Sequence, residues 1–159
     1  MPQYFSKECK YDEDTIGLLI ALNGLLVVFI EMPLILLLEK KQKIFPFIIA
    51  GSLCLPVAFA IIKFGNGLIS LALLYTFVIT FSEILAMPFM MNYTLSRPKK
   101  ERQGQYSALY SISYGIANIA APSLGLGIAA VYGFGTMFYF FIALGIVVAG
   151  GFALLNNKN

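Results

Sequence analysis

Five apolar stretches of this chain are each long enough to cross a membrane, and they limit its fold more than any other feature. They cover residues 15–38, 44–62, 68–94, 106–132 and 136–155. About 20 helical residues span the roughly 30 Å of hydrocarbon in a bilayer. Because a backbone in lipid must satisfy its own hydrogen bonds, each stretch is expected to be a helix. The sequence therefore predicts an all-α, polytopic membrane protein with five transmembrane helices.

The composition agrees with lipid as the solvent. Hydrophobic residues make up 59% of the chain and charged residues 12%, whereas soluble domains carry about 25% charged residues. The chain has no histidine, which excludes His-based zinc sites and Ser–His or Cys–His nucleophile pairs. No nucleic-acid partner is expected, because the net charge of +3 comes from a few loop clusters. No metal, cofactor or enzymatic activity is expected either, since Glu31 and Glu83 lie on separate spans and offer no evident catalytic partner.

The distribution of basic residues predicts the orientation. With residues 1–14 as an extracytoplasmic polar segment and 156–159 as a cytoplasmic tail, eight of the 11 basic residues face the cytoplasm. The positive-inside rule favours this arrangement, with the N-terminus outside and the C-terminus inside the plasma (inner) membrane. The cytoplasmic loops carry the charges that we single out: Glu39, Lys40, Lys41, Arg97 and Arg102.

The spans differ in their polar content. The second and fifth contain almost no polar side chains, which predicts peripheral helices that face lipid over much of their surface. The first, third and fourth contain the intramembrane polar groups, so they are expected to line the interior or a water-filled path.

Two carboxylates lie at membrane depth, Glu31 in the first span and Glu83 near the middle of the third. A charged carboxylate is costly there, so each is a candidate for proton coupling. The alternative is that each forms a hydrogen bond to a neighbouring helix. Glu31 has a further interpretation, because it precedes Pro33 and could satisfy backbone groups that a proline kink frees.

Further polar side chains are candidates for lining a cavity. In the third span, Thr76 and Thr80 share a helical face with Glu83. A polar and aromatic stripe on the fourth span includes Tyr110, Tyr114 and Asn118, and the first span contributes Asn23. These side chains either line a substrate cavity or form interhelical hydrogen bonds.

The second half of the fourth span is rich in small residues around Gly115, Pro122 and Gly125. Small residues let helices approach closely, which is one interpretation. The other is a flexible point in a helix that rocks during transport, since Pro122 removes a backbone donor.

Several segments resemble the C-terminal half of a known family. Segments 16–26 and 31–34 resemble its eighth helix, 38–41 its charged loop, 82–88 its tenth helix, and 101–106 with 115–125 its loop and eleventh helix. The family is the major facilitator superfamily of transporters, in its drug/proton antiporter-like branch. The resemblance implies helices eight to twelve, a partial C-terminal six-helix bundle.

The resemblance also implies secondary active transport by alternating access, coupled to an ion. Two features depart from the family. The charged loop at Glu39–Lys41 lacks the usual glycines and Asp–Arg pattern, and the family has twelve helices in two halves. We therefore expect a fragment whose partners are membrane lipid, a missing N-terminal half and a small solute or drug. The alternative is a small non-transporting membrane protein that assembles or regulates a larger membrane complex.

Overall fold

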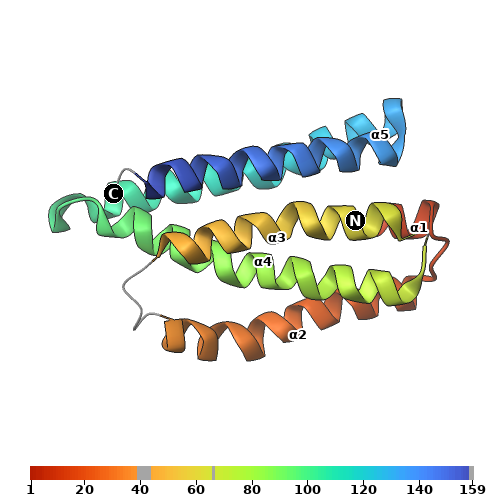
Figure 1. Cartoon of the computed structure of the whole chain (residues 1–159), viewed down its shortest axis with the longest axis horizontal. Helices are drawn as coiled ribbons and strands as arrows, with labels where there is room; N and C mark the ends of the chain where they lie inside the picture. The colour runs from red at the N-terminus through yellow and green to blue at the C-terminus, as the bar shows by residue number, and fades with distance from the viewer. Residues whose placement is uncertain (39–43, 66, 158–159) are drawn as a thin grey trace.

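A computed structural model of the chain describes residues 1–38, 44–65 and 67–157. In order, the elements are α1 (Pro2–Lys7), α2 (Glu13–Leu38), α3 (Phe45–Phe64), α4 (Ile69–Ser96), the short 3-10 helix η1 (Lys100–Arg102) and α5 (Gln103–Asn156). No strand occurs in these ranges. The long helices run side by side along one axis (Figure 1), with α4 between α2 and α3, and α5 against α3.

Four helical stretches of the described chain are long and apolar enough to cross a membrane: Glu13–Leu37, Phe45–Phe64, Ile69–Ser96 and Lys100–Asn156. The sequence predicted five, and the difference lies in α5. Its 54 residues would extend about 80 Å if straight. The helix is instead interrupted at Gly133, where φ is 82° and ψ is 162°.

The chain folds back on itself at Gly133. Figure 1 shows the blue part of α5 returning along the cyan part. Consistently, a Cβ built on Gly125 would lie 3.1 Å from the ring of Phe141, and residues 16 positions apart in a straight helix would be about 24 Å apart. We call residues 103–132 the first arm of α5 and residues 134–156 the second arm. The predicted spans 106–132 and 136–155 leave residues 133–135 between them, and within α5 the non-helical angles are confined to Gly133.

The helix α3 has close neighbours in both α4 and the second arm of α5. A Cβ on Gly51 would lie 2.8 Å from the backbone nitrogen of Ala86 in α4, and a Cβ on Gly145 would lie 2.8 Å from Pro56. Of the most apolar window of each helix, 39% is buried in α3 and 6% in α2. Most of this window of α3 is not buried within the chain, so the lipid-facing position of the second span stays a prediction. Small residues let α4 and the second arm approach α3 from two sides.

The segment 1–14 also differs from a simple polar extension, because it contains α1. Phe5 is buried at 4% exposure and its ring lies 6.2 Å from that of Tyr75. Tyr4 packs edge-on against Phe138 at 4.8 Å between ring centroids. Burial raises the pKa of Tyr4 to about 12, so its hydroxyl keeps its proton and donates to the carbonyl of Ile62 at 3.5 Å. Aromatic side chains thus attach α1 to the end of the bundle.

Candidate functional site

A polar cluster joins α2 to α4 at the depth of Glu83. The amide Nδ2 of Asn23 donates to Oγ1 of Thr80 at 2.8 Å and to Oε2 of Glu83 at 3.4 Å. The structure therefore brings together three of the candidates predicted from the sequence. The hydrogen bond from the side-chain amide of Asn23 stabilises the charged form of the Glu83 carboxylate in a region where charge is costly.

The local sequence of α4 fixes the direction of these bonds. The hydroxyl of Thr80 donates to the carbonyl of Thr76 at 2.6 Å, and that of Thr76 donates to Ala72 at 3.0 Å. Threonine hydroxyls in helices often bond the preceding turn in this way. Because the proton of Thr80 is used within α4, its oxygen is left to accept from Asn23.

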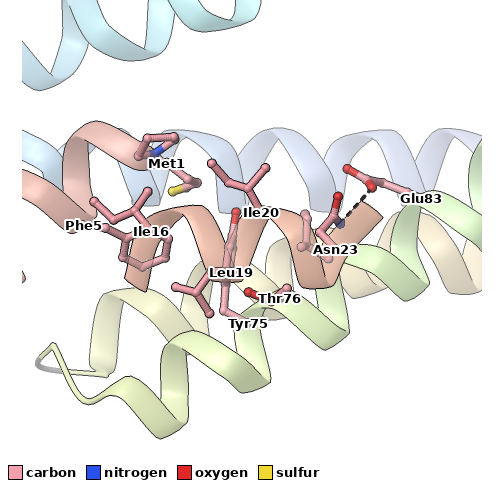
Figure 2. A pocket seen from close by; sticks show the side chains of 11 residues that line it. Met1, Phe5, Ile16, Leu19, Ile20, Asn23, Tyr75, Thr76 and Glu83 are labelled. Carbon is pink, nitrogen blue, oxygen red and sulfur yellow. Dashed lines mark hydrogen bonds between the residues drawn. The ribbon is translucent and has the colours of Figure 1, made fainter. Parts of the chain in front are cut away.

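Glu83 lines a cavity of about 180 Å³ between α1, α2 and α4, which we call the α2 cavity. Figure 2 shows the side chains of Asn23 and Glu83 pointing toward one another, with Tyr75 and Thr76 further toward α1. Phe5 lines the opposite end of this cavity. Asn23 and Thr76, which were also predicted to line a cavity, lie at the same cavity as Glu83. Thr80 does not line this cavity but accepts the hydrogen bond from Asn23.

Glu83 also lines a second cavity of about 230 Å³ between α3, α4 and the second arm of α5, which we call the α3 cavity. Its polar wall is formed by Ser52 and Ser82, and its apolar wall includes Met87 and Met90. The hydroxyl of Ser82 donates to the carbonyl of Gly51 at 2.7 Å, which connects this cavity wall to the close contact between α3 and α4.

The aromatic stripe of the first arm contacts α4 at Met87. The hydroxyl of Tyr110 lies 3.5 Å from the carbonyl oxygen of Met87, and that of Tyr114 lies 3.9 Å from its Sδ. These two predicted residues thus form interhelical contacts next to the α3 cavity without lining it.

Asn118, Pro122 and Gly125 line a different cavity, of about 640 Å³, between residues 1–3, α3 and the two arms of α5. The structure does not bring Asn118 to Glu83. The first arm is helical through Gly115 and Pro122, and Gly125 packs against Phe141. The packing interpretation fits Gly125, and a flexible point at Pro122 stays a prediction.

The remaining candidates lie away from the cluster. Glu31 is half-buried on α2 and lines none of the three cavities. Glu39, Lys40 and Lys41 lie outside the described residues. The guanidinium of Arg97 lies 4.5 Å from the ring of Tyr93 and contacts its hydroxyl, and Arg102 is exposed in η1.

Sequence reasoning missed Tyr75 and Ile79. Both line the α2 cavity, and Ile79 also lines the α3 cavity. They precede Glu83 by eight and four residues, a spacing that places them on its helical face. That signal was present, but apolar and aromatic side chains at helical spacing are common in any membrane helix and do not stand out.

Comparison with known proteins identifies the family. The sequence profile of the Major Facilitator Superfamily matches residues 1–158, nearly the whole chain. Neither the curated proteins nor the solved structures gave a significant match.

Proposed function

The chain belongs to the Major Facilitator Superfamily, and from that premise we propose that it forms the C-terminal helices of an ion-coupled secondary transporter. The observation that carries this proposal is the environment of Glu83. Its carboxylate lies at membrane depth, accepts a bond from Asn23 on another helix, and borders two cavities. A carboxylate that gains and loses a proton in this position couples proton movement to a change in helix packing.

We propose that the chain crosses the bilayer five times, because each arm of α5 is long enough to cross alone. At 1.5 Å per residue, the two arms extend about 45 Å and about 35 Å, and the hydrocarbon is about 30 Å thick. The reversal at Gly133 places them side by side. The five helices then correspond to helices eight to twelve of the drug/proton antiporter-like branch.

The exposed polar groups of the first arm support a second helical half as the partner. Ser113, Tyr114 and Asn118 are all exposed on this arm. Polar side chains in transmembrane helices usually face a bundle interior or a water-filled cavity. A second half that covers this arm and α2 would enclose a central cavity between the two halves. Rocking of the halves would then give access to this central cavity from alternate sides of the membrane.

The basic residues support the orientation. Arg97, Lys99, Lys100 and Arg102 lie together between α4 and α5, at the end opposite α1. The positive-inside rule places this end in the cytoplasm and α1 outside the plasma (inner) membrane. A cysteine in place of Lys100 should react with an impermeant thiol reagent only from the cytoplasmic side, and reaction from outside would reverse the assignment.

The test of coupling is Glu83→Gln, which keeps the shape of the side chain and removes its proton chemistry. Ethidium, a fluorescent lipophilic cation, serves as the probe, and its transport by the chain together with its N-terminal half is followed in vesicles under an imposed pH gradient. We expect Glu83→Gln to abolish gradient-driven transport at normal expression. Glu101→Gln, which removes the same charge from η1, is the matched control and should transport normally. Transport by Glu83→Gln with an unchanged pH dependence contradicts the proposal.

A further inference from the structure

The loop between α4 and α5 has a surplus of positive charge. We call residues 97–102 the basic loop. It contains four basic residues and one acid: Arg97, Lys99, Lys100, Arg102 and Glu101. All five side chains are exposed, and the loop lies at the end of the bundle opposite α1 (Figure 1). A surplus of positive charge in so short a segment indicates an anionic partner.

The backbone keeps these charges close together. The amide nitrogen of Arg102 donates to the carbonyl of Lys99 at 2.9 Å, and a turn closed by such a bond brings its two ends within about 7 Å of each other. The side-chain amide of Gln103 donates to the carbonyl of Leu95 at 3.4 Å. The start of α5 is therefore bound to the end of α4, and the basic loop between them is compact.

The length of α4 places the basic loop at the level of the lipid headgroups. The helix has 28 residues, which extend about 42 Å. The hydrocarbon of a bilayer is about 30 Å thick, and the bilayer with its headgroups is about 40–45 Å thick. A helix of this length begins and ends among the headgroups. Arg97, which directly follows the last residue of α4, therefore lies near the phosphates.

An aromatic contact holds the loop at this level. The guanidinium of Arg97 lies 4.5 Å from the centre of the Tyr93 ring and contacts its hydroxyl. The same ring packs edge-on against Phe45 at the start of α3, with 4.8 Å between ring centroids. Tyrosine is enriched where hydrocarbon meets the headgroups. This contact therefore attaches the basic loop to the membrane interface and to a second helix.

Anionic phospholipids fit both the charge and the depth of the loop. Basic residues next to a transmembrane helix are attracted to anionic lipids, with a gain of about fivefold in affinity for each Lys or Arg. Arginine binds phosphate oxygens through two parallel N–H groups, and lysine binds them as a point charge. Free phosphate has the same chemistry, but its binding does not require a position among the headgroups. The position of the loop therefore favours the lipid.

We propose that the basic loop binds the headgroups of anionic phospholipids in the cytoplasmic leaflet, with Lys99, Lys100 and Arg102 contacting the phosphates. The loop joins α4, which carries the candidate site, to the first arm of α5. Bound lipid would thus hold the ends of both helices at the membrane surface. This inference goes beyond the proposed function and uses only its orientation, which assigns the leaflet.

The experiment measures which lipid lies next to the loop. The chain contains no tryptophan, so a single introduced tryptophan reports the lipid around one position. Leu109 is 63% exposed on the first arm and lies about 10 Å beyond Arg102 along the helix. In liposomes, dibrominated phosphatidylglycerol and dibrominated phosphatidylcholine each quench the fluorescence of Leu109→Trp according to their affinity. We expect phosphatidylglycerol to bind about tenfold more strongly.

Matched variants separate the basic loop from charge in general. In the Leu109→Trp chain, Lys99→Gln with Arg102→Gln should lower the preference for phosphatidylglycerol to about twofold or less. The control is Lys7→Gln with Lys10→Gln, which also removes two exposed basic residues three positions apart, but at the α1 end. The control should keep the full preference. A separate reporter, Tyr132→Trp at the other end of the first arm, should show no preference.

Three outcomes overturn the inference. The first is equal affinity of the two lipids at Leu109→Trp, and the second is equal preference at Tyr132→Trp. The third is a preference that persists when Lys99→Gln and Arg102→Gln are combined in a chain of unchanged helix content. If this double variant does not fold, Lys100→Gln carries the test, with the preference lowered about fivefold.

Two further comparisons identify the source of the phosphate and separate this inference from the proposed function. Replacing sodium chloride by inorganic phosphate at the same ionic strength should leave the lipid preference unchanged. Loss of the preference would mean that the loop binds free phosphate and would overturn the assignment to lipid. Both leaflets of the liposome contain the same lipids, so a reversed orientation does not affect the result. Glu83→Gln should keep the lipid preference, whatever the result of its transport test.

Discussion

Two parts of this molecule differ in how closely their helices pack, and we call them the sealed part and the open part. The sealed part consists of α3, α4 and the second arm of α5, where Gly51 lies against the backbone of α4 and Gly145 lies against the ring of Pro56. The open part consists of α2 and the first arm of α5. A Cβ added to Gly24, Gly115 or Gly127 in the open part would meet nothing within 4 Å, and Gly125 is the exception in the first arm because it packs against Phe141.

The sealed part positions the candidate site, and the open part contributes the helix α2 that borders it. In the sealed part, close contacts fix the position of α4 and therefore of Glu83. In the open part, α2 contacts α4 through the polar pair of Asn23 and Thr80 and leaves a cavity beside it. Substitutions of the same type in the two parts should therefore have different effects on stability, and each prediction below pairs one residue with a matched control.

The largest effect is expected at Gly51. A Cβ there would lie 2.8 Å from the nitrogen of Ala86 and 2.9 Å from the carbonyl oxygen of Ser82, and both are backbone atoms that cannot rotate away. Gly51→Val should lower the free energy of unfolding by about 3 kcal/mol or more, at the upper end of the cost of overpacking. The measurement is unfolding in mixed detergent micelles with increasing dodecyl sulfate.

Gly24→Val is the control for Gly51→Val, because it adds the same side chain to α2 in open space. Its free energy of unfolding should change by less than about 1 kcal/mol. Equal losses at the two positions would show that the sealed and open parts do not differ in packing.

The second prediction concerns Gly133, which joins the open arm of α5 to the sealed arm. Its φ of 82° and ψ of 162° belong to a region that is essentially restricted to glycine. No neighbour lies within 4 Å of an added Cβ, so Gly133→Ala tests the backbone conformation alone. The loss of stability should be about 1–3 kcal/mol.

Gly127→Ala is the matched control for Gly133→Ala, since Gly127 also has no close neighbour but lies within the helical first arm. Alanine should stabilise a helical position by up to about 1 kcal/mol relative to glycine. A stabilising Gly133→Ala would mean that α5 continues through this residue, and the two arms would then not lie side by side.

Hydropathy predicted the positions of the helices well. The third predicted span, 68–94, corresponds to α4 at Ile69–Ser96, and the second, 44–62, to α3 at Phe45–Phe64. These agreements follow from the large free energy of moving apolar side chains from water into lipid, which depends on composition and length. The short helix α1 was missed because the charges of segment 1–14 obscured the aromatic pair Tyr4 and Phe5.

Hydropathy could not predict which faces pack. Lipid chains are as apolar as leucine, so an apolar side chain gains little by facing a helix instead of lipid. The near absence of polar residues in α3 therefore indicated a membrane span without showing which of its faces pack against α4 and α5. The better signal was the small residue Gly51, which permits close approach. The candidate site was easier to predict, since a carboxylate at membrane depth needs a partner and Glu83 finds one in Asn23.

The smallest predicted effect compares two serines. The hydroxyl of Ser82 donates to Gly51 in the neighbouring helix at 2.7 Å, whereas that of Ser123 donates to Ile119 in its own helix at 2.8 Å. Interhelical hydrogen bonds in membrane proteins contribute about 0.6 kcal/mol on average. Ser82→Ala should therefore lower the free energy of unfolding by about that amount, and Ser123→Ala should leave it nearly unchanged. An equal change in both variants would mean that the Ser82 bond adds nothing to the α3–α4 contact, which backbone proximity at Gly51 would then maintain alone.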